Sequence, residues 1–388
     1  MRFPEFSGEW EKTSIGECFS KVENGLTYDT DNTSGVPVTR IETISDKSIN
    51  YDRVGYANID DKISKYEMQY GDVLFSHINS LKHIGKTAFY DAAQPLYHGM
   101  NLILLRAKKS LDSKFLYYTL NTHKFLHRCQ VLANQAVNQA SINTKELKSI
   151  NISVPQMQEQ QKISGLISLL DERIETQRKI IEKYESLIRG LITSVNKGEI
   201  CKCKDTALKD VLTEVHEKNV ENHEVCSVSV SQGVINQIDY LGRSFAAKEV
   251  LHYNVVNYGD IVYTKSPTGE FPYGIVKRSN LDRPVAVSPL YGVYRPVNDY
   301  VGIYLHLYFK SPVNTKNYLH RLIQKGAKNT INITNQHFLD NQILIPEHGW
   351  LEIIVNAAST IEKMIQIECD ALLWLERQRN YLLSKMFI

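Results

Sequence analysis

The feature that most constrains this chain is a long-period internal repeat. The stretch YGDVLFSHINS begins at Tyr70, and YGDIVYTKSPT begins at Tyr258. SINTKELKSINISVP ends at Pro155 and NITNQHFLDNQILIP ends at Pro346, while SIGECFSKV at Ser14 resembles ALKDVLTEV further along. The three matches keep the same order at a nearly constant offset of about 190 residues. The chain is therefore a duplication of a unit much longer than a solenoid repeat.

Each copy is predicted to contain a small domain of mixed α/β structure. In the first copy, short apolar runs bounded by turn residues predict strands over 36–42, 72–77, 85–90 and 102–107, and Asp112 offers an N-cap to a helix over 113–130. In the second copy we expect strands over 261–264, 273–277 and 292–295, with helices over 302–310 and 315–325.

After the proline that ends each copy, Pro155 and Pro346, the apolar residues follow a helical heptad pattern. The first seam contains Ile163, Ile167, Leu170, Ile174, Gln177, Ile181, Tyr184, Ile188, Leu191 and Val195. The second contains Ile354, Ala358, Ile361, Ile365, Glu368, Leu372, Leu375, Arg379, Leu382 and Met386. A single run of this kind also fits the core helix of a globular domain. Two runs at the same place in a repeat favour two helices of about 60 Å that pack as an antiparallel coiled coil.

The predicted fold class is therefore α/β (α+β), with two small mixed domains separated by two long antiparallel helices. Head 1 is predicted at residues 1–155, the first long helix at 156–198, head 2 at 199–346 and the second long helix at 347–388. The two halves are expected to form a pseudo-two-fold internal repeat. Glu368 and Arg379 are polar positions in an apolar seam and are expected to fix its register.

Composition narrows the class of protein. Hydrophobic residues make up 43% of the 388 residues and charged residues 23%, as in soluble globular proteins. We find no secretory signal and no apolar run long enough for a membrane span, and six scattered cysteines suit a reducing cytoplasm. A net charge of +2 argues against nucleic-acid binding through a continuous basic surface, but it leaves room for local basic patches.

Catalytic motifs are missing from the sequence. The chain has no complete P-loop, no G-x-G-x-x-G, no G-x-S-x-G and no Pro-Pro. Cys201 and Cys203 form a single C-x-C, which is too little for a zinc site. Glu146 and Lys148 have the E-x-K spacing of many nucleases but lack a preceding Pro-Asp pair, so we interpret them as the solvent face of a short helix. We predict a binding and spacing protein with no catalytic residue and no metal.

The sequence around Pro155, where the first head passes into the first long helix, resembles that of a known family. Pro155, the run EQQKI over 159–163 and the pair Leu170-Asp171 are similar to the central conserved region of type I restriction–modification specificity (S) subunits. YGDVLFS and NQAVNQASINTKELKSINISVP in the first copy, and YGDIVYTKS and NTINITNQHFLDNQILIP in the second, resemble the same family in the same order. After Pro346 the second copy departs from the pattern, because Glu347, His348 and Gly349 replace the Gln/Glu cluster.

The resemblance implies a non-catalytic subunit of a DNA-modifying complex. Each head would be a target recognition domain that binds one half of a bipartite, asymmetric double-stranded DNA target. The long helices would set the distance between the halves and dock two methyltransferase (M) subunits. S-adenosylmethionine would be bound by those partners, and ATP by a motor–nuclease (R) subunit, so that this chain holds no cofactor.

Side chains that can read base edges gather in corresponding parts of the two copies. Arg, Lys, Asn and Gln are the best suited to base edges, and Ser and Thr are less selective. The candidates in head 1 are Arg40, Asn79, Ser80, Lys82, His83, Lys86, Gln135, Asn138 and Gln139. Those in head 2 are Lys265, Ser266, Thr268, Lys277, Arg278, Lys328 and Asn329. The competing interpretations are solvated surface charges and, for the amides, turn and capping chemistry before a short helix.

Two other functions remain open from the sequence. The chain could be a catalytic DNA-modifying protein whose active site has no familiar motif. It could also be a coiled-coil scaffold with two protein-binding heads. Methyl transfer or cleavage by the isolated chain would favour the first, and absence of DNA protection by the assembled complex would favour the second.

Overall fold

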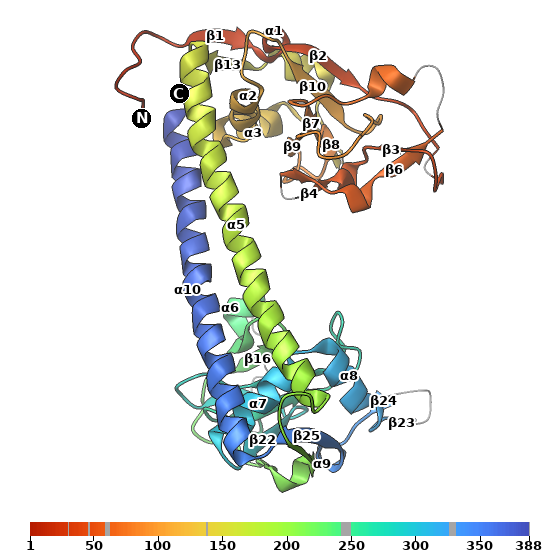
Figure 1. Cartoon of the computed structure of the whole chain (residues 1–388), viewed down its shortest axis with the longest axis vertical. Coiled ribbons are helices and arrows are strands. Elements are labelled where there is room, and N and C mark those ends of the chain that lie inside the picture. Colours follow the sequence, from red (N-terminus) through yellow and green to blue (C-terminus); the bar gives the residue numbers. More distant parts are fainter. Residues whose placement is uncertain are drawn as a thin grey trace. The chain divides into compact units, whose positions relative to one another are not determined.

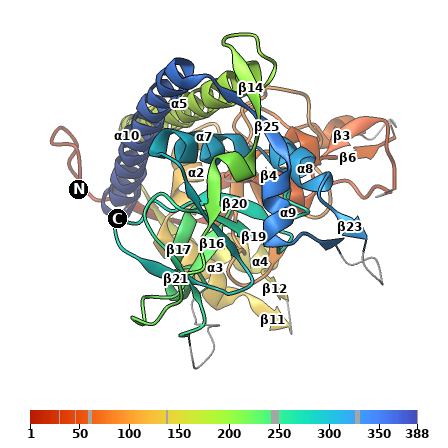
Figure 2. The same cartoon turned by 90° about the horizontal axis from the view of Figure 1, so that it is seen from below.

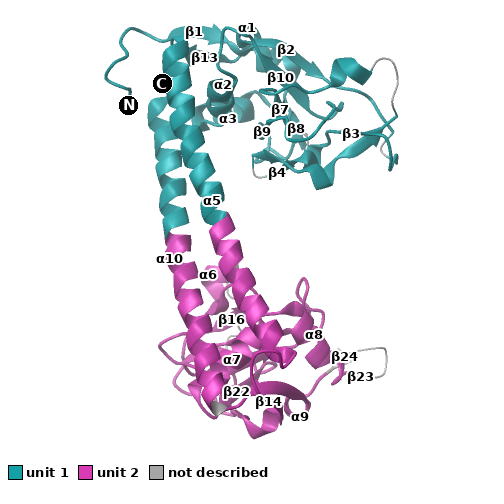
Figure 3. Ribbon diagram, in the orientation of Figure 1, with its two compact units in different colours: residues 1–178, 371–388 teal, residues 179–370 magenta. Residues whose placement is uncertain are grey.

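The computed structural model describes residues 1–29, 31–45, 47–58, 63–136, 139–241, 250–325 and 331–387 (Figure 1). The chain forms two compact units, coloured separately in Figure 3. Unit 1 contains residues 1–178 and 371–388, and unit 2 contains residues 179–370. Each unit therefore combines one head with segments of both long helices.

Unit 1 is built on a four-stranded antiparallel sheet of order β2-β10-β7-β9. Its strands are β2 (Phe19–Asn24), β10 (Ile103–Ala107), β7 (Val73–Phe75) and β9 (Thr87–Phe89). The helices are α1 (Ile15–Cys18), α2 (Ser113–Leu120), α3 (His123–Leu132) and α4 (Thr144–Ser149). Smaller ladders pair β1 (Glu11–Ser14) with β13 (Asn151–Val154), β3 (Val36–Val38) with β6 (Gly55–Ala57), and β4 (Ile44–Ser45) with β5 (Ser48–Ile49). A core of Ile103, Leu105, Phe115 and Leu116 joins the sheet to α2.

Unit 2 repeats this sheet in the same order, β15-β22-β19-β20. Its strands are β15 (Leu212–Glu214), β22 (Gly292–Pro296), β19 (Ile261–Thr264) and β20 (Ile275–Arg278). The other pairs are β14 (Cys203–Ala207) with β25 (Gln342–Pro346), β16 (Cys226–Ser229) with β17 (Gly233–Asn236), β18 (Asn254–Val256) with β21 (Val285–Val287), and β23 (Gln324–Lys325) with β24 (Ile331–Asn332). Helices α6 (Gln237–Leu241; Figure 1), α7 (Asp299–Phe309), α8 (Pro312–His320) and α9 (Asn335–Asp340) also belong to the unit, and the last three are labelled in Figure 2. The shared strand order confirms the internal repeat.

One predicted helix is divided in the structure. The sequence predicted a single helix over 113–130, but α2 ends at Leu120 and α3 begins at His123. The Thr122 side chain accepts a hydrogen bond from the Phe125 N–H and so caps a new helix. The Asn121 amide donates to Thr87 Oγ1 at 2.7 Å and thereby ties the break to β9. The capping hydrogen bond at Thr122 therefore starts a second helix within a segment whose apolar spacing is continuous.

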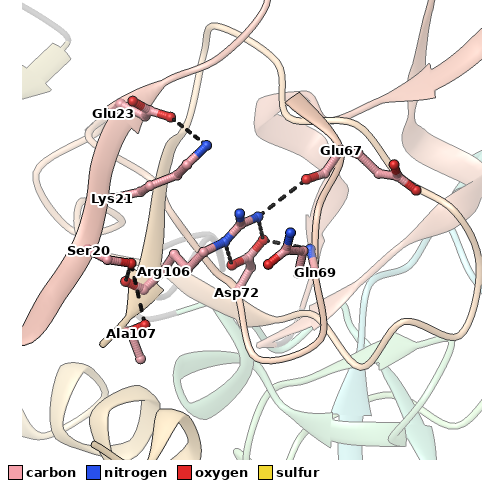
Figure 4. A network of polar contacts seen from close by, with 8 residues as sticks. All are labelled: Ser20, Lys21, Glu23, Glu67, Gln69, Asp72, Arg106 and Ala107. Carbon is pink, nitrogen blue, oxygen red and sulfur yellow. Dashed lines mark hydrogen bonds and ion pairs between the residues drawn. The ribbon is translucent and has the colours of Figure 1, made fainter. Parts of the chain in front are cut away.

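The repeated Y-G-D motif has a structural explanation in both units. In unit 1, Arg106 on β10 donates from Nε and Nη2 to the two oxygens of Asp72, each at 2.7 Å (Figure 4). Asp72 Oδ2 also accepts from the Gln69 N–H at 2.7 Å. In unit 2, Arg295 contacts Asp260 in the same bidentate way at 3.0 and 3.1 Å. The motif therefore supplies a buried carboxylate that joins a turn to the neighbouring strand.

We expect Asp72→Ala to destabilise unit 1 by about 3 kcal/mol, because it leaves a partly buried guanidinium without its partner. Asp72 is only 1% exposed, whereas Glu23, which pairs with Lys21 nearby, is 53% exposed. The matched control Glu23→Ala is therefore expected to cost less than about 1 kcal/mol. Urea unfolding of the full chain, followed by circular dichroism, measures both. Equal costs for the two substitutions would contradict the role of the buried pair.

The two long helices are α5 (Met157–Asn196) and α10 (His348–Met386). In unit 1, Ile163 and Ile167 of α5 share a core with Leu383 and Met386 of α10. In unit 2, the C-terminal residues Ile188, Ile192 and Val195 of α5 share a core with Leu351, Ile354 and Ala358 near the start of α10. The paired segments thus run in opposite directions. Every predicted seam position is buried or half-buried, which confirms the antiparallel pairing.

The start of α5 is fastened to head 1 by the Gln/Glu cluster. Glu159 is 1% exposed and accepts two hydrogen bonds from the Arg2 guanidinium, each at 2.7 Å. Gln160 is also buried; its amide donates to the Pro155 carbonyl and its oxygen accepts from the Asp112 N–H. The cluster therefore joins the start of α5 to head 1.

The polar seam residue Arg379 is buried in unit 1. Its guanidinium pairs with Asp171 of α5, and Asp171 also accepts a 2.8 Å hydrogen bond from the Tyr118 hydroxyl. One residue of each long helix and one residue of α2 therefore meet at a single charged contact. This contact accounts for the arginine in a mostly apolar seam.

Candidate DNA interface

A small sheet in head 1 carries three of the side chains predicted to contact DNA, those of Asn79, Gln135 and Gln139. Strand β8 (Ile78–Asn79) pairs with β12 (Gln139–Ser141), which in turn pairs with β11 (Asn134–Ala136). Asn79 lies opposite Ala140, and Ala140 lies opposite Gln135. Since directly opposite residues point to the same face, Asn79 and Gln135 share one face and Gln139 lies on the other. The tip of the hairpin, including the predicted contact Asn138, lies outside the described residues.

The turn after β8 orders the second group of candidates. The Ser80 carbonyl accepts from the N–H groups of His83 and Ile84, and the Ser80 hydroxyl lies 3.0 Å from His83 Nδ1. The side chains of Ser80, Lys82, His83 and Lys86 are exposed. The turn therefore presents two lysines and a histidine next to the amide-bearing sheet.

The sequence left two roles open for the amide-rich stretch, base contact and capping. In the structure, different residues of the stretch fit each role. Asn143 and Glu146 form a capping box at the start of α4, with hydrogen bonds of 2.8 and 3.2 Å. Asn143 and the E-x-K glutamate therefore have a structural role, as the capping interpretation predicted. Gln135 and Gln139 lie on the hairpin with exposed side chains and remain candidates for base contact.

Head 2 places its candidates after the corresponding strand. Lys265, Ser266 and Thr268 follow β19 and are exposed. Thr268 and Phe271 exchange backbone hydrogen bonds at 2.9 and 3.1 Å and so form a tight loop. Partial burial lowers the pKa of Lys265. The hairpin β23–β24 corresponds to β11–β12, but its connection, including Lys328 and Asn329, lies outside the described residues.

Two candidates in head 2 need correction. Lys277 is 3% exposed and Arg278 is 4% exposed, so neither side chain is available to DNA in this structure. Arg278 pairs with Asp299, and its guanidinium lies over the Tyr258 ring at 4.6 Å. Burial, and then the charge of Lys310, lower the pKa of Lys277 to about 8. The sequence predicted surface contacts here because two charged residues follow an apolar run. In the structure, both belong to β20.

Head 1 contains one further candidate, Arg40, and one contact that the sequence did not indicate. Arg40 is 38% exposed and 4.0 Å from Glu42, so its charge is largely solvated. The sequence did not single out Asn24, whose amide nitrogen lies 3.3 Å from Nε2 of His77 at the end of β7. Burial lowers the pKa of His77, which favours the neutral imidazole. The position of Asn24 before a glycine turn was the available signal.

Other candidate chemistry is limited. The Cys201 and Cys203 sulfurs lie 3.4 Å apart, close to the end of α5. In the part of the chain that the structure describes, no three His, Cys, Asp or Glu side chains are grouped to hold a metal ion. The described helices include none with the length and apolar character that crossing a membrane requires.

Comparison with known proteins agrees with this geometry. The family model described as "Type I restriction modification DNA specificity domain" matches residues 7–185. The putative type I restriction enzyme MjaX specificity subunit of Methanocaldococcus jannaschii is 39% identical over 193 residues, which cover 48% of this chain and 45% of the relative. The MjaVIII specificity subunit of the same organism is 23% identical over 205 residues, covering 50% and 47%. The aligned part thus spans less than half the length of either curated relative.

Solved structures share the fold over nearly the whole chain. The type I restriction–modification S subunit from M. genitalium superposes with a TM-score of 0.59 at 12% identity, covering 100% of this chain and 99% of that one. A chain from a structure of complex assembly and conformational transition in a type I R-M system has a TM-score of 0.53 at 12% identity, covering 98% of each. Residues 7–185 therefore match the DNA specificity domain of type I restriction–modification systems, and the whole chain shares the fold of solved S subunits.

Proposed function

We propose that this chain selects the DNA target of a type I complex, with each head reading one half of a bipartite, asymmetric sequence. The observation that carries the proposal is that both heads have the same four-stranded sheet, yet the segments after β7 and β19 differ. A shared scaffold with different loops is what two different half-sites require. The proposed heads are residues 1–155 and 199–346, joined by the long helices at 156–198 and 347–388.

The helices are proposed to act as spacer and docking site. A continuous helix of 40 residues is about 60 Å long, enough to set a separation of about one DNA turn between contacts, which is roughly 34–36 Å. Two methyltransferase subunits would bind the helices and supply S-adenosylmethionine. A motor–nuclease subunit would join through the complex and use ATP. The chain itself would remain non-catalytic and act in the cytoplasm.

A second apolar stripe on α10 supports docking. On α10, exposed apolar residues follow helical spacing within each unit, namely Ile353, Met364 and Ile367 in unit 2 and Trp374 and Tyr381 in unit 1. Trp374 and Ile367 are 68% and 65% exposed, which is unusual for such large side chains. A stripe of this kind on a helix that already buries a separate seam fits a further helix from a partner.

We expect Trp374→Ala to weaken binding of the methyltransferase subunit by about 2 kcal/mol, or roughly 30-fold, since exposed tryptophans in such stripes are frequent hot spots. The matched control is Gln366→Ala, which changes an exposed side chain of the same helix off the stripe. Titration of the purified partner with each variant measures the affinities. Comparable losses for the two variants would refute docking through the stripe.

The proposed function is tested by DNA protection. The chain is co-expressed with the methyltransferase subunit encoded beside it, and the purified complex is footprinted on DNA that carries its target. The proposal predicts two protected segments separated by an accessible gap. Absence of protection would favour a protein-binding scaffold, and methyl transfer by the isolated chain would favour a catalytic protein.

A further inference from the structure

A cavity in unit 1 lies between head 1 and the helix pair. Its volume is about 630 Å³, within the usual range for small-molecule sites. Residues of the β8–β9 turn, α2 and α3 form one wall, and residues of α5 and α10 form the other. All of its lining residues belong to unit 1.

The charge lining the cavity is unbalanced. Five cationic and three anionic side chains line it. Both arginines are already paired, Arg379 with Asp171 and Arg178 with Glu376 at 2.8 Å. Among the described residues, the other cations that line the cavity are the lysines Lys47, Lys82 and Lys86, and the other carboxylate is that of Glu175. The two fixed pairs leave an excess of positive charge.

Lys47 lies between β4 and β5 and lines the cavity. Burial, and then the nearby charge of Arg379, lower the pKa of Lys47. The Lys47 carbonyl accepts a 3.0 Å hydrogen bond from the Tyr117 hydroxyl, which fixes its backbone at the edge of the cavity. An anion in the cavity would offset the repulsion among these cations. Ile84, Leu126 and Ile174 add an apolar surface to the same cavity.

We infer that this cavity binds a small phosphorylated ligand of the nucleotide class. Lysines hold phosphate as point charges, and the apolar surface suits a flat ring beside it. The cavity volume accommodates a nucleoside diphosphate and is more than inorganic phosphate needs. Such a ligand would touch head 1 and both long helices, so its binding would stiffen their connection. Two of the lysines, Lys82 and Lys86, are also candidate DNA contacts, so the test below includes a DNA duplex as competitor.

The test uses the full chain and ADP as probe, with adenosine and matched ionic strength as controls. Isothermal titration is expected to show saturable ADP binding and none for adenosine. Removing two cations, Lys47→Gln with Lys86→Gln, is expected to weaken ADP binding by about tenfold or more. The matched pair Lys145→Gln with Lys148→Gln lies on exposed positions of α4 and is expected to leave the affinity within about twofold.

A charge-retaining variant separates binding from folding. Lys86→Arg is expected to keep ADP binding, and the unliganded melting temperature of each variant reports its folding. Absence of ADP binding by the wild-type chain, or binding that survives the Lys47/Lys86 change, would overturn the inference. Displacement of ADP by a short DNA duplex would assign the cavity to the DNA backbone and would also overturn the nucleotide assignment.

Discussion

Replacing Asn79 and Gln135 with alanine in head 1 is expected to relax recognition of one half of the DNA target and leave the other half unchanged. The two side chains share one face of the β8–β12–β11 sheet. An amide that pairs with adenine through two hydrogen bonds contributes about 1–3 kcal/mol of discrimination against the wrong base. Losing both is therefore expected to reduce discrimination at one half-site by roughly 100-fold.

The measurement is binding of the assembled complex to duplexes altered in one half-site at a time. Gln94→Ala is the matched control, because Gln94 is an exposed amide of the same head away from the sheet. Equal loss of discrimination at both half-sites would show that the heads do not read separately. A uniform loss of affinity for every sequence would mean that these amides contact phosphates instead of bases.

Adding one heptad to both long helices is expected to lengthen the gap in the recognised DNA by about three base pairs. Seven residues add about 10 Å of helix, and base pairs stack at about 3.4 Å. Inserting a whole heptad keeps buried seam residues such as Ile167 and Ile188 on the same face of the helix. Three base pairs turn the duplex by about 100°, so activity on the longer target is expected to be lower than in the parent.

The control is the same insertion in α5 alone, at a position between Ile174 and Ile181. The unmatched heptad must then bulge or shift the seam, so the gap is expected to stay the same or the chain to lose stability. Mapping of the modified sites gives the gap directly. An unchanged gap with both helices extended, in a folded chain, would contradict the proposal that the helices set the spacing.

The sequence predicted the helix seams and the strands because both depend on local periodicity. It predicted the repeat because similar segments recur in the same order along the chain. The heptad positions of the two long helices, from Ile163 on α5 and up to Met386 on α10, are all buried or half-buried in the structure. Likewise, the Y-G-D matches mark a real structural equivalence, since Asp72 and Asp260 make the same ion pair. These features follow from spacing that is visible along the chain.

The sequence was less informative where tertiary contacts decide the outcome. Lys277 and Arg278 look like surface cations along the chain, but β20 is covered by α7, where Asp299 pairs with Arg278. Likewise, Glu159 pairs with Arg2, a residue far away in sequence, and no local pattern indicates this pairing. The pairing of β8 with β12 joins residues about 60 positions apart, and no local pattern predicts such a ladder.

The central claim is that one chain specifies a two-part DNA sequence through two different heads. The most direct measurement is to co-express the chain with the proposed methyltransferase partner in a host lacking other adenine modification and to map methylated adenines by sequencing. The account predicts one asymmetric motif with two specific halves separated by a gap of fixed length. A single continuous motif, a symmetric one, or methylation without sequence preference would contradict it.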